Sequence, residues 1–198
     1  MKTRIFKSTF IVLLTISFLS FDIPKGWFAA GSDPDKYEMG IDKTIFHDGK
    51  NAATIKSVEE KIKGFGTLMQ DSRPDKFLGK RVRMSGYVKS ENVKDWAGLW
   101  FRVDPINSKG ENQTLSFDNM QDRSIKKTTD WTKYEIVLDV PTHASNFAFG
   151  ALLSGTGQIW FDNITFEIVD DTVKPTGSIN AGKTSSLQLE PSNLDFEN

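Results

Sequence analysis

The side chains best suited to ligand binding lie in two short segments in the middle of the chain, residues 96–104 and 118–123. The first segment contributes Trp96, Trp100, Arg102 and Asp104, and the second contributes Asp118, Asn119, Gln121 and Arg123. A flat aromatic ring beside a forked donor and a carboxylate can stack on a sugar ring while it hydrogen bonds to the hydroxyl groups. These eight residues are therefore the predicted ligand-binding set.

The direction of these side chains follows from strand alternation. Trp100, Arg102 and Asp104 alternate with Leu99, Phe101 and Val103, so the two sets point to opposite faces of a strand. The polar set then faces solvent or a ligand, while the apolar set faces the core. One alternative stays open, in which Arg102 and Asp104 only pair with neighbours and Trp100 packs under a loop.

The other tryptophans, Trp27, Trp131 and Trp160, are predicted to pack in the core or at its rim. Trp160 lies between two apolar residues in a strand-like segment, which favours burial.

Asp162 lies inside an otherwise apolar strand-like segment, residues 158–168. A carboxylate in such a place needs a hydrogen-bonding partner or a cation. With no cysteine and no histidine cluster, oxygen ligands would favour a hard ion such as calcium. A hydrogen bond to the backbone of a nearby loop is an equal alternative.

Patterns typical of enzymes are missing from the sequence. It contains no HExxH or GxSxG motif, and the two histidines, His47 and His143, lie in predicted turns. A carboxylate pair drawn from Asp104, Glu111 and Asp118 would suit glycoside hydrolysis, but acids are common at strand edges. We therefore expect no catalytic activity, with a glycoside hydrolase as a remote alternative.

Residues 177–184 match the sequence pattern of the phosphate-binding loop of nucleoside triphosphatases, but the segments around them do not fit that loop. That chemistry needs a buried strand before the loop and a helix after it. Here a charged, proline-containing stretch precedes the match, and Pro191 interrupts the short tail that follows it. The sequence does not predict a nucleotide site.

Composition narrows the class of partner. The net charge of −1 comes from 25 basic and 26 acidic residues mixed along the chain. Without a basic stripe, neither nucleic acid nor anionic lipid is an expected partner. The 15 Phe, 5 Trp and 3 Tyr residues favour a β-rich core, because aromatic side chains suit a pleated surface.

Alternation of period two dominates the chain after Pro24. The predicted strands are 37–41, 52–57, 66–70, 81–89, 99–104, 114–117, 133–140, 146–153 and 158–168. Turn signals rich in Gly, Asn, Asp and Pro separate them. Only residues 58–63 offer a helical fragment. Many short strands without crossover helices predict an all-β, antiparallel β-sandwich of the jelly-roll type.

The chain divides into three predicted parts. Residues 1–21 form a signal peptide, with Lys2, Arg4 and Lys7 before the apolar run Ser8–Phe21. Residues 24–169 form the sandwich domain, and residues 170–198 form a linker and a strand-like segment. We therefore expect a secreted or cell-surface protein that does not contact the membrane after cleavage. A buried N-terminal helix or an uncleaved anchor is the alternative.

Several segments together resemble carbohydrate-binding-module-like jelly rolls, which are related to galactose-binding-like domains. The matching segments are residues 26–32, 80–89, 96–104, 117–126, 129–131, 134–141 and 149–163. Similar domains occur in small secreted bacterial proteins and fused to AraC-type helix-turn-helix regulators. No helix-turn-helix pattern is evident, so a regulatory role is not carried over. The resemblance implies a jelly roll, often with a structural calcium, and ligand binding on a concave face or at loop tips.

The sequence departs from the resemblance at its start. Related jelly rolls open with a strand like Asn-Leu-Asp-Phe-Glu, which here stands at the other end of the chain, at residues 193–197. Either a second repeat is truncated, or this segment folds back to complete the sheet. In the second case Glu197 could approach Asp162 and share a cation with it.

The leading function predicted is therefore a secreted, non-catalytic module that binds carbohydrate, in the form of a cell-wall or extracellular polysaccharide. The alternative from another class is a structural or interaction protein of the extracellular matrix or cell surface, which would associate through an exposed edge or apolar patch.

Overall fold

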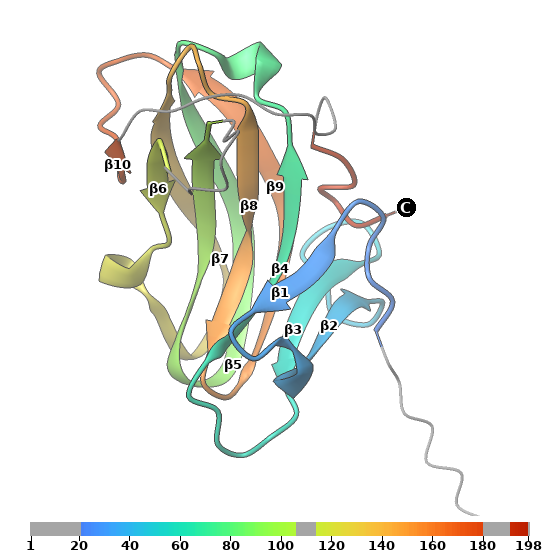
Figure 1. Cartoon of the computed structure of the whole chain (residues 1–198). Helices are drawn as coiled ribbons and strands as arrows, with labels where there is room; N and C mark the ends of the chain where they lie inside the picture. The colour runs from blue at the N-terminus through green and yellow to red at the C-terminus, as the bar shows by residue number, and fades with distance from the viewer. Residues whose placement is uncertain (1–20, 106–113, 180–190, 198) are drawn as a thin grey trace, which may run out of the picture.

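The computed structural model describes residues 21–105, 114–179 and 191–197, which form two packed β-sheets (Figure 1). The predicted signal peptide therefore lies outside the described residues, apart from Phe21. The strands are β1 (Phe28–Gly31), β2 (Tyr37–Asp42), β3 (Ala52–Ser57), β4 (Phe65–Ser72), β5 (Lys80–Asp104), β6 (Ser116–Asp118), β7 (Ile125–Val140), β8 (Asn146–Ser154), β9 (Gln158–Val169) and β10 (Ser178–Ile179). Every strand pair is antiparallel, and the predicted jelly-roll sandwich is confirmed.

Strand β5 belongs to both sheets. Its first half pairs with β7 and β9, and its second half pairs with β8 and β6. The first sheet therefore has the order β1-β4-β8-β5-β6-β10, and the second has the order β7-β5-β9-β3-β2. Register shifts between Val88 and Ala97, and a positive φ at Asn92, bend β5 where it passes from one sheet to the other.

Helical structure is limited to single turns in the part of the chain described. The helical fragment predicted at residues 58–63 is wrong, because this segment is an irregular connection between β3 and β4. Six residues are too few to offset the cost of helix nucleation without a packed face. Short 3₁₀ turns occur instead at Pro34–Lys36 (η1), Asp75–Phe77 (η2) and Gln121–Arg123 (η3). No described helix has the length and apolar character needed to span a membrane.

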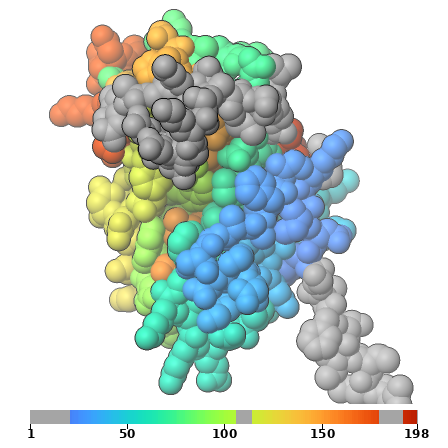
Figure 2. All heavy atoms as spheres, viewed as in Figure 1, coloured from blue at the N-terminus to red at the C-terminus, as the bar shows by residue number. Residues whose placement is uncertain are grey.

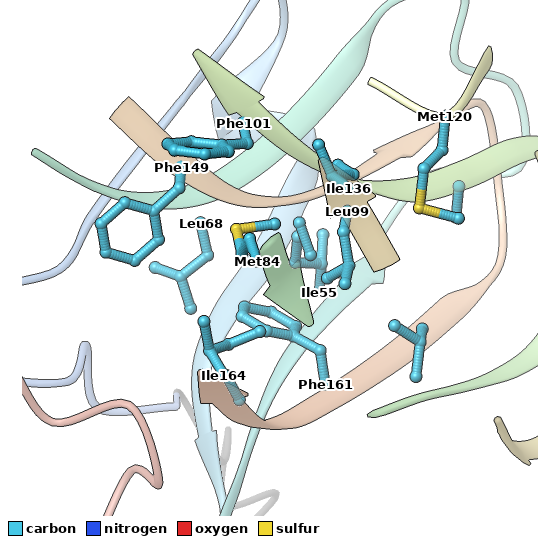
Figure 3. Close-up of a cluster of buried hydrophobic side chains, with 14 of the residues drawn as sticks. Ile55, Leu68, Met84, Leu99, Phe101, Met120, Ile136, Phe149, Phe161 and Ile164 are labelled. Atoms are coloured by element: carbon cyan, nitrogen blue, oxygen red, sulfur yellow. The ribbon is translucent and has the colours of Figure 1, made fainter. Parts of the chain in front are cut away.

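The core lies between the two sheets and is rich in phenylalanine. Leu99 and Phe101 of β5 point inward with Met84 from the other half of the same strand, as strand alternation predicts (Figure 3). The ring centroids of Phe101 and Phe147 lie 4.7 Å apart with an interplanar angle of 85°. Edge-to-face contacts of this kind add to the free energy gained by burial.

Two of the remaining three tryptophans, Trp27 and Trp160, are buried as predicted, whereas the prediction is wrong for Trp131, which packs against neither hydrophobic cluster. Trp27 and Trp160 are buried, and their indole N–H groups donate to the backbone oxygen of Asn193 and to a carboxylate oxygen of Asp42. Trp131 is half-buried on the outer face of the second sheet, with its ring centroid 5.5 Å from that of His47.

Residues 191–197 fold back onto the sandwich, although they form no strand. The Phe196 side chain is fully buried, with its ring centroid 5.2 Å from that of Trp27 and 5.3 Å from that of Phe161. The backbone of Ser192 forms two hydrogen bonds with the side-chain amide of Gln70, at 2.9 and 2.8 Å. The segment is held by the core rather than by a ladder of strand hydrogen bonds.

The segment after β9 is more ordered than a flexible linker. Two backbone oxygens, those of Asp171 and Val173, accept hydrogen bonds from Arg81, and the backbone N–H of Thr176 donates to Val137. Strand β10 then pairs with β6. The first part of the predicted linker, residues 170–179, therefore contacts the sandwich through Arg81 and through β6.

Candidate functional site

A groove with an apolar floor crosses the outer face of the first sheet. Four of its side chains, Met69, Trp100, Ala148 and Leu152, form a hydrophobic cluster separate from the main core. The groove encloses about 420 Å³ and is lined by Ala30, Gly31, Phe65, Thr67, Met69, Trp96, Trp100, Arg102, Phe117, Asn119, Leu152 and Ser154. That volume lies within the range of sites for small ligands. In Figure 2 the orange atoms of β8 lie in a hollow between the blue and teal atoms of β1 and β4 and the yellow atoms around β6.

Trp100 forms the floor of the groove. It is paired in register with Gly150 of β8, and its indole reaches across that strand to β4. The indole N–H donates to the hydroxyl of Thr67 on β4 at 2.8 Å, and this hydroxyl donates to the backbone oxygen of Ala151 at 2.7 Å. Because Trp100 is only 7% exposed, it acts as a fixed base for the groove.

Trp96 and Phe117 form the more exposed aromatic walls. Both are half-buried and pack against the Trp100 cluster. Aromatic faces with this partial exposure can accept the apolar face of a ligand ring without unfolding of the protein.

Arg102 and Asp104 form the ion pair that the sequence left open as an alternative. The Nε atom of Arg102 lies 2.9 and 2.8 Å from the two carboxylate oxygens of Asp104. Arg102 still lines the groove, with its guanidinium carbon 6.0 Å from the Trp100 ring centroid. Asp104 therefore orients Arg102, and it is also an acceptor for the Asn146 side-chain amide at 3.3 Å.

Asp118 and Arg123 serve the fold rather than the groove. Asp118 is paired with Phe101, so its side chain points inward and is only 7% exposed. Its Oδ2 atom lies 2.6 Å from Nη2 of Arg123, and its Oδ1 atom accepts the backbone N–H of Met120, which has a φ of 60°. This pair of a buried carboxylate and a half-buried guanidinium group braces the tight turn after β6.

The predicted set is thus divided by the structure. Trp96, Trp100, Arg102 and Asn119 line the groove, and Asp104 contacts one of them. Gln121 is exposed in a separate shallow hollow next to Asp118 and Asn119.

Sequence reasoning missed the apolar residues contributed by the neighbouring strands. Met69 of β4 and Leu152 of β8 lie on the groove side, while Leu68 and Leu153 lie on the core side. A strand that is apolar on both faces signals a second covered or ligand-binding surface. The unbroken apolar run at 147–153 carried that signal.

The two carboxylates predicted to bind calcium, Asp162 and Glu197, both contact the loop between β2 and β3. Asp162 is fully buried, and its Oδ2 atom accepts the backbone N–H groups of His47 at 3.0 Å and Asp48 at 3.2 Å. Burial raises the pKa of Asp162, and these hydrogen bonds oppose the rise. The Oε1 atom of Glu197 accepts the N–H groups of Lys50 and Asn51 at 2.6 and 2.7 Å.

Oxygens that accept N–H groups need no ion, so the hydrogen-bonding alternative is the one observed at Asp162. Among the described residues there is no group of three or more His, Cys, Asp or Glu side chains placed to hold a metal. A cation between Asp162 and Glu197 would require backbone carbonyl oxygens of the β2–β3 loop to turn toward it. Calcium binding stays a prediction.

A sequence relative shows which kind of protein contains a similar segment. The chain is 44% identical over 174 residues to an uncharacterized HTH-type transcriptional regulator, YbfP, of Bacillus subtilis (strain 168). The match covers 87% of this chain and 57% of the relative, so the chain spans little more than half the length of that protein. No family model matches the sequence.

Solved structures with a similar fold include carbohydrate-binding modules. The CBM22-1 xylan-binding domain of Paenibacillus barcinonensis Xyn10C has a TM-score of 0.51 and 17% identity, covering 76% of this chain and 90% of that domain. The CBM22-1–GH10 modules of Clostridium thermocellum xylanase 10B, complexed with xylohexaose, have a TM-score of 0.53 and 13% identity, covering 75% of this chain and 27% of that one.

A cyclase from Fischerella sp. TAU also has this fold, with a TM-score of 0.50 and 16% identity over 74% of this chain and 85% of the cyclase. The chain therefore has the fold of a carbohydrate-binding module. Since one fold hosts several functions, the fold alone does not assign a ligand, and a binding role depends on the residues of the groove.

The described lining supplies aromatic faces, a guanidinium group, an amide and hydroxyl groups. These groups bind a ligand by stacking and hydrogen bonding. Cleavage of a glycosidic bond by the usual mechanism needs a pair of carboxyl groups flanking it, and the described lining contributes none.

Proposed function

We propose that this protein is a secreted, non-catalytic carbohydrate-binding module and that the groove on the first sheet is its site. The observation that carries the proposal is an apolar groove on an outer sheet face, floored by Trp100 and walled by Trp96 and Phe117. Such a face on a single chain marks a binding surface, because an exposed apolar hollow is otherwise unfavourable. The similar fold of xylan-binding modules supports carbohydrate as the ligand class.

Export is part of the proposal and depends on the charged and apolar residues at 2–21. N-terminal sequencing of the protein recovered from culture medium tests it. Recovery only from the cell interior, with Met1 or Lys2 at the N-terminus, would contradict export.

Replacing Trp96 with alanine is expected to weaken binding to the cognate oligosaccharide at least tenfold, a change of about 1.4 kcal/mol. The half-buried ring contributes an aromatic wall, and its loss leaves the Trp100 floor and the Thr67 hydrogen bond in place. Isothermal titration calorimetry against a panel that includes xylohexaose measures the effect.

Trp131→Ala is the matched control for this change, because Trp131 is a half-buried tryptophan on the outer face of the other sheet. The affinity of this variant should equal that of the wild type. Equal losses in the two variants, or no loss in Trp96→Ala, would remove the groove from the proposed site.

The sequence relative favours a second candidate function, in which the same domain senses a ligand within a regulator. Under that proposal the groove would bind a soluble sugar and transmit its presence to another part of an assembly. Both proteins should then bind the same oligosaccharide, and that sugar should change the DNA affinity of the relative. A relative whose DNA affinity is unaffected by every sugar bound by this chain would rule the sensing role out.

We also propose a structural calcium ion held by Asp162 and Glu197 with backbone oxygens of the β2–β3 loop. The support is that two carboxylates converge on one short loop. Calcium added in excess should raise the melting temperature relative to EDTA-treated protein, because an ion that binds only the folded state stabilises it. The Glu197→Gln variant should lose that rise, whereas an equal rise in the variant, or none in the wild type, would contradict the proposal.

A further inference from the structure

The floor of the groove offers a ligand little to hydrogen bond with. Two neighbouring cross-strand rows form it, with Ala30, Thr67 and Leu152 in one row and Met69 and Trp100 in the next. The polar side-chain groups of these five residues are the Thr67 hydroxyl and the Trp100 indole N–H, and both already bond within the protein. A ligand hydroxyl on this floor would therefore lose water without gaining a partner, which is unfavourable.

The polar side chains of the described lining lie around this floor rather than on it. Ser154 and Arg102 lie in the rows on either side of it. Asn119 borders it from the turn after β6, where its backbone oxygen packs against Gly98 of β5. A complementary ligand must therefore combine an apolar group for the floor with polar groups for the rim.

Two of these rim side chains offer donors. A guanidinium group only donates, and because Asp104 accepts from Nε of Arg102, the Nη groups are the ones that a ligand can use. The Oδ1 atom of Asn119 accepts the backbone N–H of Gln121 at 3.1 Å, which leaves the Nδ2 donors of that amide for a ligand. A carbonyl oxygen, which only accepts, complements such donors, whereas a hydroxyl group also brings a donor that needs an acceptor of its own.

Building on the proposed carbohydrate-binding role, we propose that the ligand is an oligosaccharide that carries acetyl groups. The sugar rings stack on the aromatic walls, and an acetyl methyl group packs on Met69 and Leu152 of the floor. The acetyl carbonyl oxygen then accepts from Asn119 or Arg102 at the rim. An acetyl group joins an apolar methyl group to a carbonyl acceptor, and O-acetyl esters and N-acetyl amides of sugars share this chemistry.

The test compares two pairs of uncharged chains by isothermal titration calorimetry. One pair is xylohexaose and O-acetylated xylohexaose, and the other is cellohexaose and the hexamer of N-acetylglucosamine. The members of a pair share a backbone and differ in acetylation. We expect the acetylated member to bind at least tenfold more tightly in one pair or both, and the pair that shows the preference tells an ester from an amide.

Asn119→Asp tests the donor at the rim, because it keeps the shape of the side chain and the oxygen that accepts from Gln121. A carboxylate in place of the amide repels a carbonyl oxygen and accepts from a hydroxyl group. The preference for the acetylated chain should therefore fall at least tenfold. Gln121→Glu makes the same chemical change at an exposed position in the same turn, and it should leave the preference as in the wild type.

Two results would overturn the inference in distinguishable ways, and the wild-type comparison decides between them even if a variant fails to fold. Unsubstituted chains that bind as tightly as their acetylated partners in both pairs would refute the acetyl preference and leave the carbohydrate site intact. A wild-type protein that binds none of the four chains would remove the proposed function itself, and the inference with it.

Discussion

The Phe196→Ala variant is expected to lose about 3–5 kcal/mol of unfolding free energy, the usual cost of truncating a fully buried phenylalanine. Phe196 has no exposed surface and packs against Trp27 and Phe161, although it lies only two residues from the C-terminus. Truncation of this ring leaves a cavity in the core, because the surrounding side chains relax only partly to fill the space. Urea unfolding, followed by tryptophan fluorescence, measures the loss.

Phe28→Ala serves as the control for this prediction. Phe28 is a strand residue with 42% of its surface exposed, so its truncation should change the stability by no more than about 0.5 kcal/mol. If Phe196→Ala also costs less than about 1 kcal/mol, residues 191–197 do not form part of the folded core.

Trp100→Ala is expected to cost about 3–5 kcal/mol of stability and to abolish carbohydrate binding as well. The indole spans β8 at Gly150 and donates to Thr67, so its removal opens a cavity between three strands and leaves a hydroxyl without its donor. The two effects are separable by comparison with Trp96→Ala, measured by thermal unfolding and calorimetry on the same preparations.

The Trp96→Ala and Trp100→Ala variants are expected to differ in stability. Trp96→Ala should retain most of the stability and lose affinity, whereas Trp100→Ala should lose both. A Trp100→Ala protein as stable as Trp96→Ala would show that Trp100 is not the floor of the groove.

Strand alternation predicted the sheet-forming segments well, because it depends only on which side chains must be buried. Leu99, Phe101 and Val103 face the core, and Trp100 and Arg102 face outward, as predicted. The alternation breaks between Lys89 and Leu99, which suggested two strands. The structure shows one strand, β5, because its bulges interrupt the pattern without ending the strand.

Which residues line the groove was harder to predict, because this depends on how neighbouring strands pair. Trp100 is buried because its indole reaches across β8 to Thr67 of β4, a contact that the sequence of β5 does not reveal. In the same way, Asp118 turns inward because it is paired with Phe101.

The C-terminal segment shows how a sequence motif can be displaced along the chain. Residues 193–197 resemble the opening strand of related domains, and the structure places them against the core from the other end of the chain. Hydrophobic packing depends on where a side chain lies in space and not on where its residue stands in the sequence. Phe196 can therefore fill a place in the core that the opening strand fills in related domains. The irregular backbone of this segment could not be predicted from the motif alone.

The indole N–H resonances of the five tryptophans test the carbohydrate site most directly, since each tryptophan reports on a known part of the fold. Two lie in the groove, at Trp96 and Trp100, and one lies on the opposite sheet, at Trp131. Titration with xylohexaose in ¹⁵N-labelled protein should shift the two groove signals and leave that of Trp131 in place. A shift at Trp131 with unchanged groove signals would contradict the account and place the ligand on the other face of the sandwich.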